Sequence, residues 1–198
     1  MARTASTMLA LGTSAPDFSL PDVVSGKTVT LDQAAGPRGL LVMFLCAHCP
    51  FVQHVNGELA RLGRDYAGRG LGMVAISSND AGAYPDDAPD GLRAQAAQHG
   101  FTFPYLYDET QDIARAFHAV CTPDYFLFDA EKNLVYRGQL DDSRPGNGIA
   151  VDGRDLRAAI DQLLAGQPIS AEQLPSIGCG IKWKERFSAE KQDAQDEN

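Results

Sequence analysis

Two mainly apolar runs, each preceded by a glycine-containing turn, organise the first half of the chain. They are "LLVMFL" at 40–45, after "GPRG", and "LGMVAIS" at 71–77, after "GRG". Short continuous apolar runs of this kind are typical of strands buried on both faces, as in the middle of a parallel or mixed sheet. Between them, apolar residues recur every three or four positions from Phe51 to Tyr66, which predicts one face of a helix.

The same alternation continues along the chain. Further helices are predicted at 92–99, 109–119 and 153–166, further strands at 101–108 and within 120–138, and an N-terminal hairpin at 13–31 around "SGK". Strands that alternate with helices indicate an α/β fold, in which a central mixed sheet is flanked by helices on both faces. The hairpin is then an N-terminal extension of this fold, and the last residues form a C-terminal tail.

The length of 198 residues suits one domain with a tail. We expect a lead at 1–11, the domain at 12–166, an extension that packs on it at 167–187, and a disordered charged tail at 188–198. Within that extension, Trp183 and Phe187 would either pack on the domain or join a homodimer.

Charge and hydropathy exclude some partners. The formal net charge of -9 disfavours nucleic acids and anionic membranes, because phosphate binding needs a basic surface. No run reaches the roughly 20 apolar residues of a membrane helix, and no signal-peptide core is evident. We therefore expect a cytoplasmic protein whose four cysteines are catalytic, metal-binding or buried rather than structural disulfides.

The strongest chemical signal is "CAHCP", which places Cys46 and Cys49 between a predicted buried strand and a helix that begins near Pro50. Free N–H groups and the helix dipole stabilise a thiolate at such a position. His48 adds a second positive neighbour that could lower a thiol pKa. We expect Cys46 to be the exposed nucleophile and Cys49 the more buried resolving thiol, with the two-residue gap letting the sulfurs meet.

Two other interpretations of the motif stay open. The cysteines could be small buried packing residues, since free cysteine is among the most buried residue types. Cys46, His48, Cys49 and His54 could instead hold zinc or Cu(I). A closed zinc site usually needs two ligand pairs, however, and no second C-x-x-C occurs in the sequence. We therefore predict no metal and no organic cofactor.

Residues farther along the chain could complete the site. Thr122-Pro123 at the start of a predicted strand could form a cis peptide bond. Cys121 and Cys179 are possible accessory thiols, although burial as packing residues is favoured for both. The carboxylates of "YPDDAPDG" are assigned to turns, as are those of "QLDDSRPGN", whose Asp141, Asp142 and Arg144 could also line the rim of the site.

Taken together, the strand–C-x-x-C–helix unit, Thr122-Pro123 with "YFLFD", and the lead "GTSAPDFSLPDV" resemble the thioredoxin-like superfamily. The similarity is to its redoxin or AhpC/TSA branch, which includes peroxiredoxin-like and TlpA/ResA-like proteins, over roughly residues 12–165. The ending "PSIGCGIKWK" is similar to that of a bacterial subgroup with a Cys-x-His-Cys-Pro motif. The resemblance implies a thioredoxin-like fold, Cys46 as nucleophile, Cys49 as resolving cysteine, Pro123 as cis-proline and Thr122 as a main-chain docking point for an extended substrate.

The sequence also departs from these relatives. His48 stands in a position where oxidising members of the superfamily have histidine. Cys46 occupies the place of the peroxidase threonine, so Cys49 would match a peroxidatic cysteine, and the "VCTPDYF" strand lacks the expected arginine. We therefore predict a thiol-disulfide oxidoreductase acting on protein or small-molecule disulfides, with a reductant such as thioredoxin or glutathione. A thiol peroxidase and a copper or zinc binding protein remain the alternatives.

Overall fold

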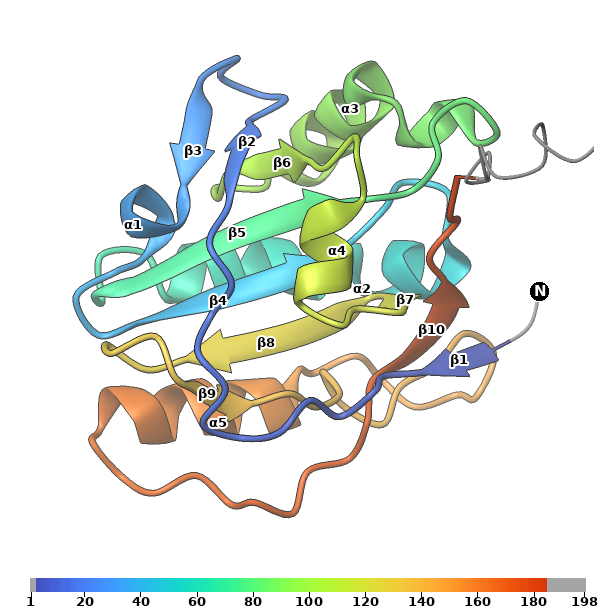
Figure 1. The fold of residues 1–198 in the computed structure, drawn as a ribbon. Coiled ribbons are helices and arrows are strands. Elements are labelled where there is room, and N and C mark those ends of the chain that lie inside the picture. Colours follow the sequence, from blue (N-terminus) through green and yellow to red (C-terminus); the bar gives the residue numbers. More distant parts are fainter. Residues whose placement is uncertain (1–2, 185–198) are drawn as a thin grey trace, which may run out of the picture.

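A five-stranded mixed sheet forms the centre of the computed structural model, which describes residues 3–184 (Figure 1). Its strand order is β6-β5-β4-β8-β9. The pairs β4–β5 and β5–β6 are parallel, whereas β4–β8 and β8–β9 are antiparallel. The bounds are β4 Gly39–Phe44, β5 Leu71–Ser77, β6 Tyr105–Tyr107, β8 Asp124–Phe128 and β9 Leu134–Tyr136. The predicted mixed sheet is therefore confirmed.

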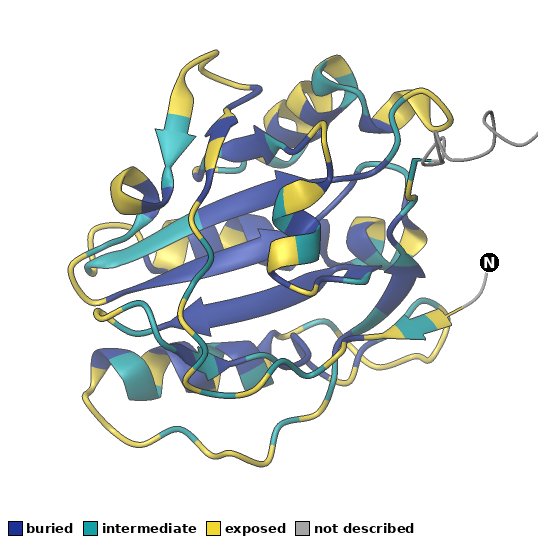
Figure 2. Cartoon of the chain, in the orientation of Figure 1, coloured by how far each residue is buried: buried dark blue, intermediate teal, exposed yellow. Residues whose placement is uncertain are grey.

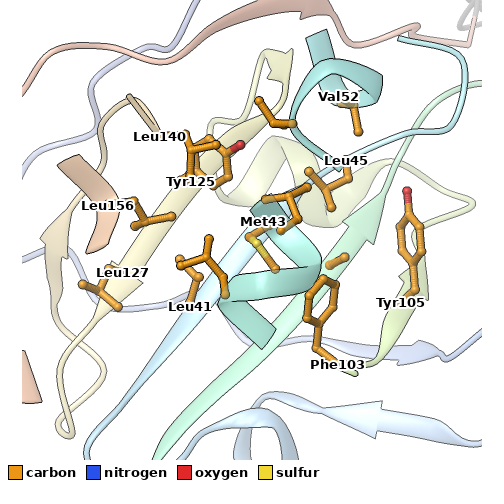
Figure 3. Close-up of a cluster of buried hydrophobic side chains, with 14 of the residues drawn as sticks. Leu41, Met43, Leu45, Val52, Phe103, Tyr105, Tyr125, Leu127, Leu140 and Leu156 are labelled. Atoms are coloured by element: carbon orange, nitrogen blue, oxygen red, sulfur yellow. The ribbon is translucent and has the colours of Figure 1, made fainter. Parts of the chain in front are cut away.

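Helices cover both faces of this sheet. Alternate residues of each strand point to opposite faces, so each strand contributes side chains to both layers. Leu41, Met43 and Leu45 pack in the same cluster as residues of α2 (Pro50–Asp65), α3 (Pro89–His99) and α5 (Arg154–Leu164) (Figure 3). Leu40, Val42 and Phe44 pack with residues of α1 (Leu31–Ala34) and α4 (Asp112–Ala116) on the other face. The strands between these layers are almost entirely buried (Figure 2).

The predicted N-terminal hairpin is present as β2 (Ser19–Pro21) paired antiparallel with β3 (Thr28–Thr30). A short 3-10 helix, η1 (Pro85–Asp87), interrupts the loop that was predicted to be irregular after β5. No helix within residues 3–184 is long and apolar enough to cross a bilayer.

A second sheet of three short strands joins the two ends of the described chain, and the sequence did not predict it. Its order is β1-β10-β7, where β1 is Arg3–Ala5, β7 is Cys121–Thr122 and β10 is Ile177–Gly180. Part of the lead at 1–11 is thus a strand, and the described part of the extension, residues 167–184, packs on the domain through β10. Within that extension, Trp183 is 40% exposed and lies against Arg115 of α4, while Phe187 and the tail at 188–198 lie outside the described residues.

Phe117, immediately after α4, should be a main determinant of stability. It is fully buried and packs edge-on against Phe44, Phe126 and Phe128, with ring centroids 5.5 to 6.0 Å apart. We expect Phe117→Ala to lower the free energy of unfolding by about 3–5 kcal/mol through loss of buried area and cavity formation. Urea unfolding measures this loss, and Phe101→Ala, at a partly exposed ring, is the control. Equal losses in both variants would contradict this assignment.

Candidate functional site

Cys46 and Cys49 lie where β4 gives way to α2, as the motif predicted. Cys49 is the N-cap residue of α2 and Pro50 is its first residue. Both cysteines are free thiols and fully buried. The expectation of an exposed Cys46 is therefore wrong, whereas Ala47 and His48 between the two cysteines are partly exposed.

The Thr122-Pro123 peptide bond is cis and lies against the cysteine pair. The Thr122 hydroxyl is 3.2 Å from the Cys46 sulfur, and the Cys49 thiol donates a 3.3 Å hydrogen bond to the Thr122 carbonyl oxygen. The juxtaposition predicted from two segments more than 70 residues apart is thus present. The main chain of Thr122, however, already pairs with Cys179 of β10, so the substrate-docking edge expected from the resemblance is occupied.

The surroundings of Cys49 favour a thiolate. Its pKa is lowered to about 5, chiefly because the Cys46 thiol donates a hydrogen bond to its sulfur. The Cys179 thiol and the backbone N–H groups of Val52 and Cys179 donate as well, and together they outweigh the opposing effect of burial. Val52 is in the first turn of α2, so its N–H has no partner within the helix.

Cys46 has the opposite environment. Its pKa is raised because its thiol serves as the hydrogen-bond donor to Cys49, because it is buried, and because the Asp87 carboxylate lies nearby. This direction is opposite to the one predicted from the helix terminus and His48. In the reduced pair, the hydrogen bond from Cys46 to Cys49 favours the negative charge on Cys49.

The ring of His48 is held by Asp87. Its Nδ1 is 2.5 Å from an Asp87 carboxylate oxygen, and its ring stacks on Tyr84 with centroids 4.7 Å apart. Asp87 is fully buried in η1 and also accepts hydrogen bonds from the N–H groups of Ala47 (2.8 Å) and His48 (3.1 Å). Asp87 therefore holds the loop between the two cysteines in place.

Asp87 is a site residue that the sequence analysis missed, since "YPDDAPDG" was assigned wholly to turns. No local pattern separates Asp87 from its neighbour Asp86, which is exposed. The only available signal was the position of the segment after β5, because loops that follow neighbouring parallel strands meet at one edge of the sheet.

We expect Asp87→Ala to lower the free energy of unfolding by about 3–5 kcal/mol, because it removes the buried partner of His48 and of two backbone donors. Removing the carboxylate charge should also lower the pKa of Cys46. Thermal unfolding and thiol titration of the reduced protein measure the two effects, with the exposed Asp86→Ala as control. Equal stabilities and equal Cys46 pKa values in Asp87→Ala and Asp86→Ala would contradict this role.

The metal alternative can be compared with the geometry of the described residues. Cys46, His48 and Asp87 place one ligand atom each within 4.8 Å of one another, a set different from the predicted Cys46, His48, Cys49 and His54. The Asp87 oxygens already accept the backbone hydrogen bonds above and one from Asn79. These three residues alone do not supply the four ligands of a closed zinc site.

The other candidate residues lie in three different surroundings. Burial raises the pKa of Cys121, whose thiol points to the Pro123 carbonyl oxygen at 3.7 Å, in line with the favoured packing interpretation. Asp141 and Arg144 border a small cavity that Pro123 also lines, and Asp141 accepts hydrogen bonds from the backbone of 152–153. Cys179 differs from these, because it packs in the same buried cluster as Cys46 and Cys49.

The mixed sheet, its helical layers and the C-x-x-C motif beside a cis-proline define a thioredoxin-like fold. The AhpC/TSA family model matches residues 11–137, and the chain belongs to this family. No curated protein gives a significant match.

Solved structures agree with this fold. An uncharacterized conserved protein from Geobacillus kaustophilus is 51% identical, with a TM-score of 0.92 over 94% of this chain and 98% of that one. A hypothetical protein from Sinorhizobium meliloti 1021 is 49% identical, with a TM-score of 0.90 over 92% and 100%. The thioredoxin domain of a thiol-disulfide oxidoreductase from Bacteroides vulgatus is 19% identical, with a TM-score of 0.61 over 79% and 99%, which shows the shared fold.

Proposed function

We propose that this protein is a thiol-disulfide oxidoreductase that exchanges electrons through Cys46 and Cys49. The observation that carries the proposal is the packing of both thiols together at the start of α2, each in contact with Thr122 of the cis peptide bond. The surroundings of Cys49 also lower its pKa to about 5. A thiolate is the form of cysteine that attacks disulfides, and a second thiol within reach can resolve the mixed disulfide.

The reaction needs only the two sulfurs and a substrate disulfide. The Cys49 thiolate attacks one substrate sulfur, forms a mixed disulfide and releases the other substrate sulfur as a thiolate. Cys46 then gives up its proton to that leaving thiolate and attacks the Cys49 sulfur. The Cys46–Cys49 disulfide forms and the second substrate sulfur leaves as a thiolate. A reductant such as thioredoxin or glutathione restores the dithiol by the reverse exchange.

Substrate access is expected over the partly exposed side of the motif. A cavity of about 490 Å³ borders Ala47 and is lined mainly by polar side chains, among them Gln53, Asn56, Gln95 and His99. The Gln95 amide also donates a 3.2 Å hydrogen bond to the Cys46 carbonyl oxygen, so this cavity reaches the motif. We place the disulfide-bearing part of the substrate here, because β10 occupies the Thr122 edge.

The redox equilibrium of the protein against glutathione, followed by intact mass and disulfide mapping, tests the proposal. We expect a reversible loss of two hydrogens that maps to Cys46 and Cys49. Because a stabilised thiolate favours the reduced form, the midpoint should lie above the roughly -270 mV of thioredoxin. Failure of this pair to form a disulfide at any glutathione ratio would refute the proposal.

A thiol peroxidase is the second candidate, and the placement of the thiolate on Cys49 favours it. The Cys49 thiolate would attack the peroxide O–O bond, forming a sulfenic acid and releasing an alcohol or water. The Cys46 thiol would donate a hydrogen bond to Cys49, in the place of a threonine. Peroxide consumption that persists in Cys46→Ser but not in Cys49→Ser would select this candidate.

A further inference from the structure

The C-terminal strand β10 brings a third thiol to the redox pair. Cys179 pairs with Thr122 in the antiparallel register between β10 and β7. The same Thr122 contacts the sulfur of Cys46 through its hydroxyl and that of Cys49 through its carbonyl oxygen. Cys46, Cys49 and Cys179 also pack in one cluster of buried side chains, and the surroundings that lower the pKa of Cys49 include both other thiols.

The backbone around Cys179 is adapted to this close approach. A Cβ atom at Gly178 would lie 1.9 Å from the Thr122 carbonyl oxygen, so only glycine lets β10 pack this tightly on β7. On its other side β10 pairs with β1, where Arg3 is the partner of Cys179 (Figure 1). Held between two strands, Cys179 is 2% exposed and keeps its place beside Cys49.

We infer that Cys179 is a second resolving thiol, and that Cys49 is a shared sulfur that forms a disulfide with either Cys46 or Cys179. This inference rests on the proposed exchange function. In the relay step, Cys179 loses its proton and attacks the Cys49 sulfur of the Cys46–Cys49 disulfide. The Cys49–Cys179 bond forms, the Cys46–Cys49 bond breaks, and the released Cys46 thiolate takes up the proton, so no outside oxidant or reductant is needed.

The relay would carry oxidation from the motif to the C-terminal strand. A substrate disulfide oxidises the Cys46–Cys49 pair, and the exchange then frees Cys46 while Cys49 stays protected beneath β10. Cys121 offers an internal contrast. It is equally buried on the neighbouring strand, but its thiol is directed to the Pro123 carbonyl oxygen and not to the Cys49 sulfur. Burial alone therefore does not account for the position of Cys179.

The inference is tested on variants of the full chain in which one cysteine at a time is replaced. Each variant is treated with oxidised glutathione and its disulfides are mapped. Cys46→Ser should lose two hydrogens and yield a Cys49–Cys179 disulfide, whereas Cys179→Ser should yield only Cys46–Cys49. Cys121→Ser should give the same products as the unmodified protein. If Cys46→Ser yields only glutathione adducts while Cys179→Ser forms Cys46–Cys49, the relay is refuted and the proposed function stands. If neither variant forms an internal disulfide, the proposed function itself fails.

A variant that keeps all four cysteines provides the second test. Gly178→Ala should push β10 away from β7 and lower the fraction of Cys49–Cys179 severalfold at a fixed glutathione ratio. Gly57→Ala is the matched control, because a Cβ at that helical position contacts nothing within 4 Å. An unchanged product ratio in Gly178→Ala, with the fold intact by circular dichroism, would overturn the role of β10.

Discussion

Replacing Cys49 with serine is expected to abolish disulfide exchange, with a loss on the order of 10³-fold or more, because it removes the attacking sulfur itself. Cys49 carries the lowered pKa and is the sulfur that both neighbouring thiols contact. Neither the Cys46–Cys49 nor the Cys49–Cys179 disulfide can form without it. Reduction of a model disulfide under single-turnover conditions measures the loss.

The matched control for this experiment is Cys121→Ser, which removes another buried thiol and should retain nearly full activity. Cys46→Ser distinguishes the roles of the two motif cysteines, because it should still form a mixed disulfide through Cys49. If Cys49→Ser formed the mixed disulfide and Cys46→Ser did not, Cys46 would be the nucleophile and the order of attack would be reversed.

The second large effect concerns Asp124, the residue after the cis-proline. This carboxyl is fully buried, and burial raises its pKa from 3.8 to about 7. The Ser6 hydroxyl and nearby N–H groups oppose the shift, but none makes a hydrogen bond of good geometry to either oxygen. The folded protein therefore holds a proton between pH 4 and 7 that the unfolded chain releases.

The contribution of Asp124 to the free energy of unfolding must consequently fall as pH rises through this window. This contribution is fully present below pH 4 and is lost by about pH 7. Its size is on the order of 4 kcal/mol. Asp124→Asn cannot ionise and should lack this loss. We expect the stability of the variant relative to the unmodified protein to increase between pH 4 and pH 8 by up to that amount.

Urea unfolding at several pH values measures this difference, and comparing the two proteins at each pH cancels the titration of all other groups. Asp142→Asn, at a half-exposed carboxylate, is the control and should show no such trend. A constant difference between the Asp124 variant and the unmodified protein from pH 4 to pH 8 would show that Asp124 is ionised in the folded state.

Sequence patterns predicted the elements with strong periodicity or continuous burial. The strand at 71–77 has the predicted limits, and the helix after Pro50 differs by one residue at each end. The meeting of the cysteine motif with Thr122-Pro123 was also predicted, since it rests on a resemblance that spans both segments. These features have in common that they are specified by many residues at once.

The features that were missed depend on single residues and on distant partners. The strand β10 contains Gly178, Cys179 and Gly180, which carry no strand pattern, and their pairing with β7 and β1 makes them a strand. Asp87 lies about 40 residues from the loop that it holds. The unequal pKa values of Cys46 and Cys49 follow from which donors surround each sulfur, which spacing alone does not determine.

The pairing of β1 with β10 also sets an order of events during synthesis on the ribosome. Cys179 pairs with Arg3, so the small sheet must wait until almost the whole chain has left the exit tunnel. Until then β10 cannot cover Cys46 and Cys49, and these thiols would be open to cellular oxidants for longest at that stage.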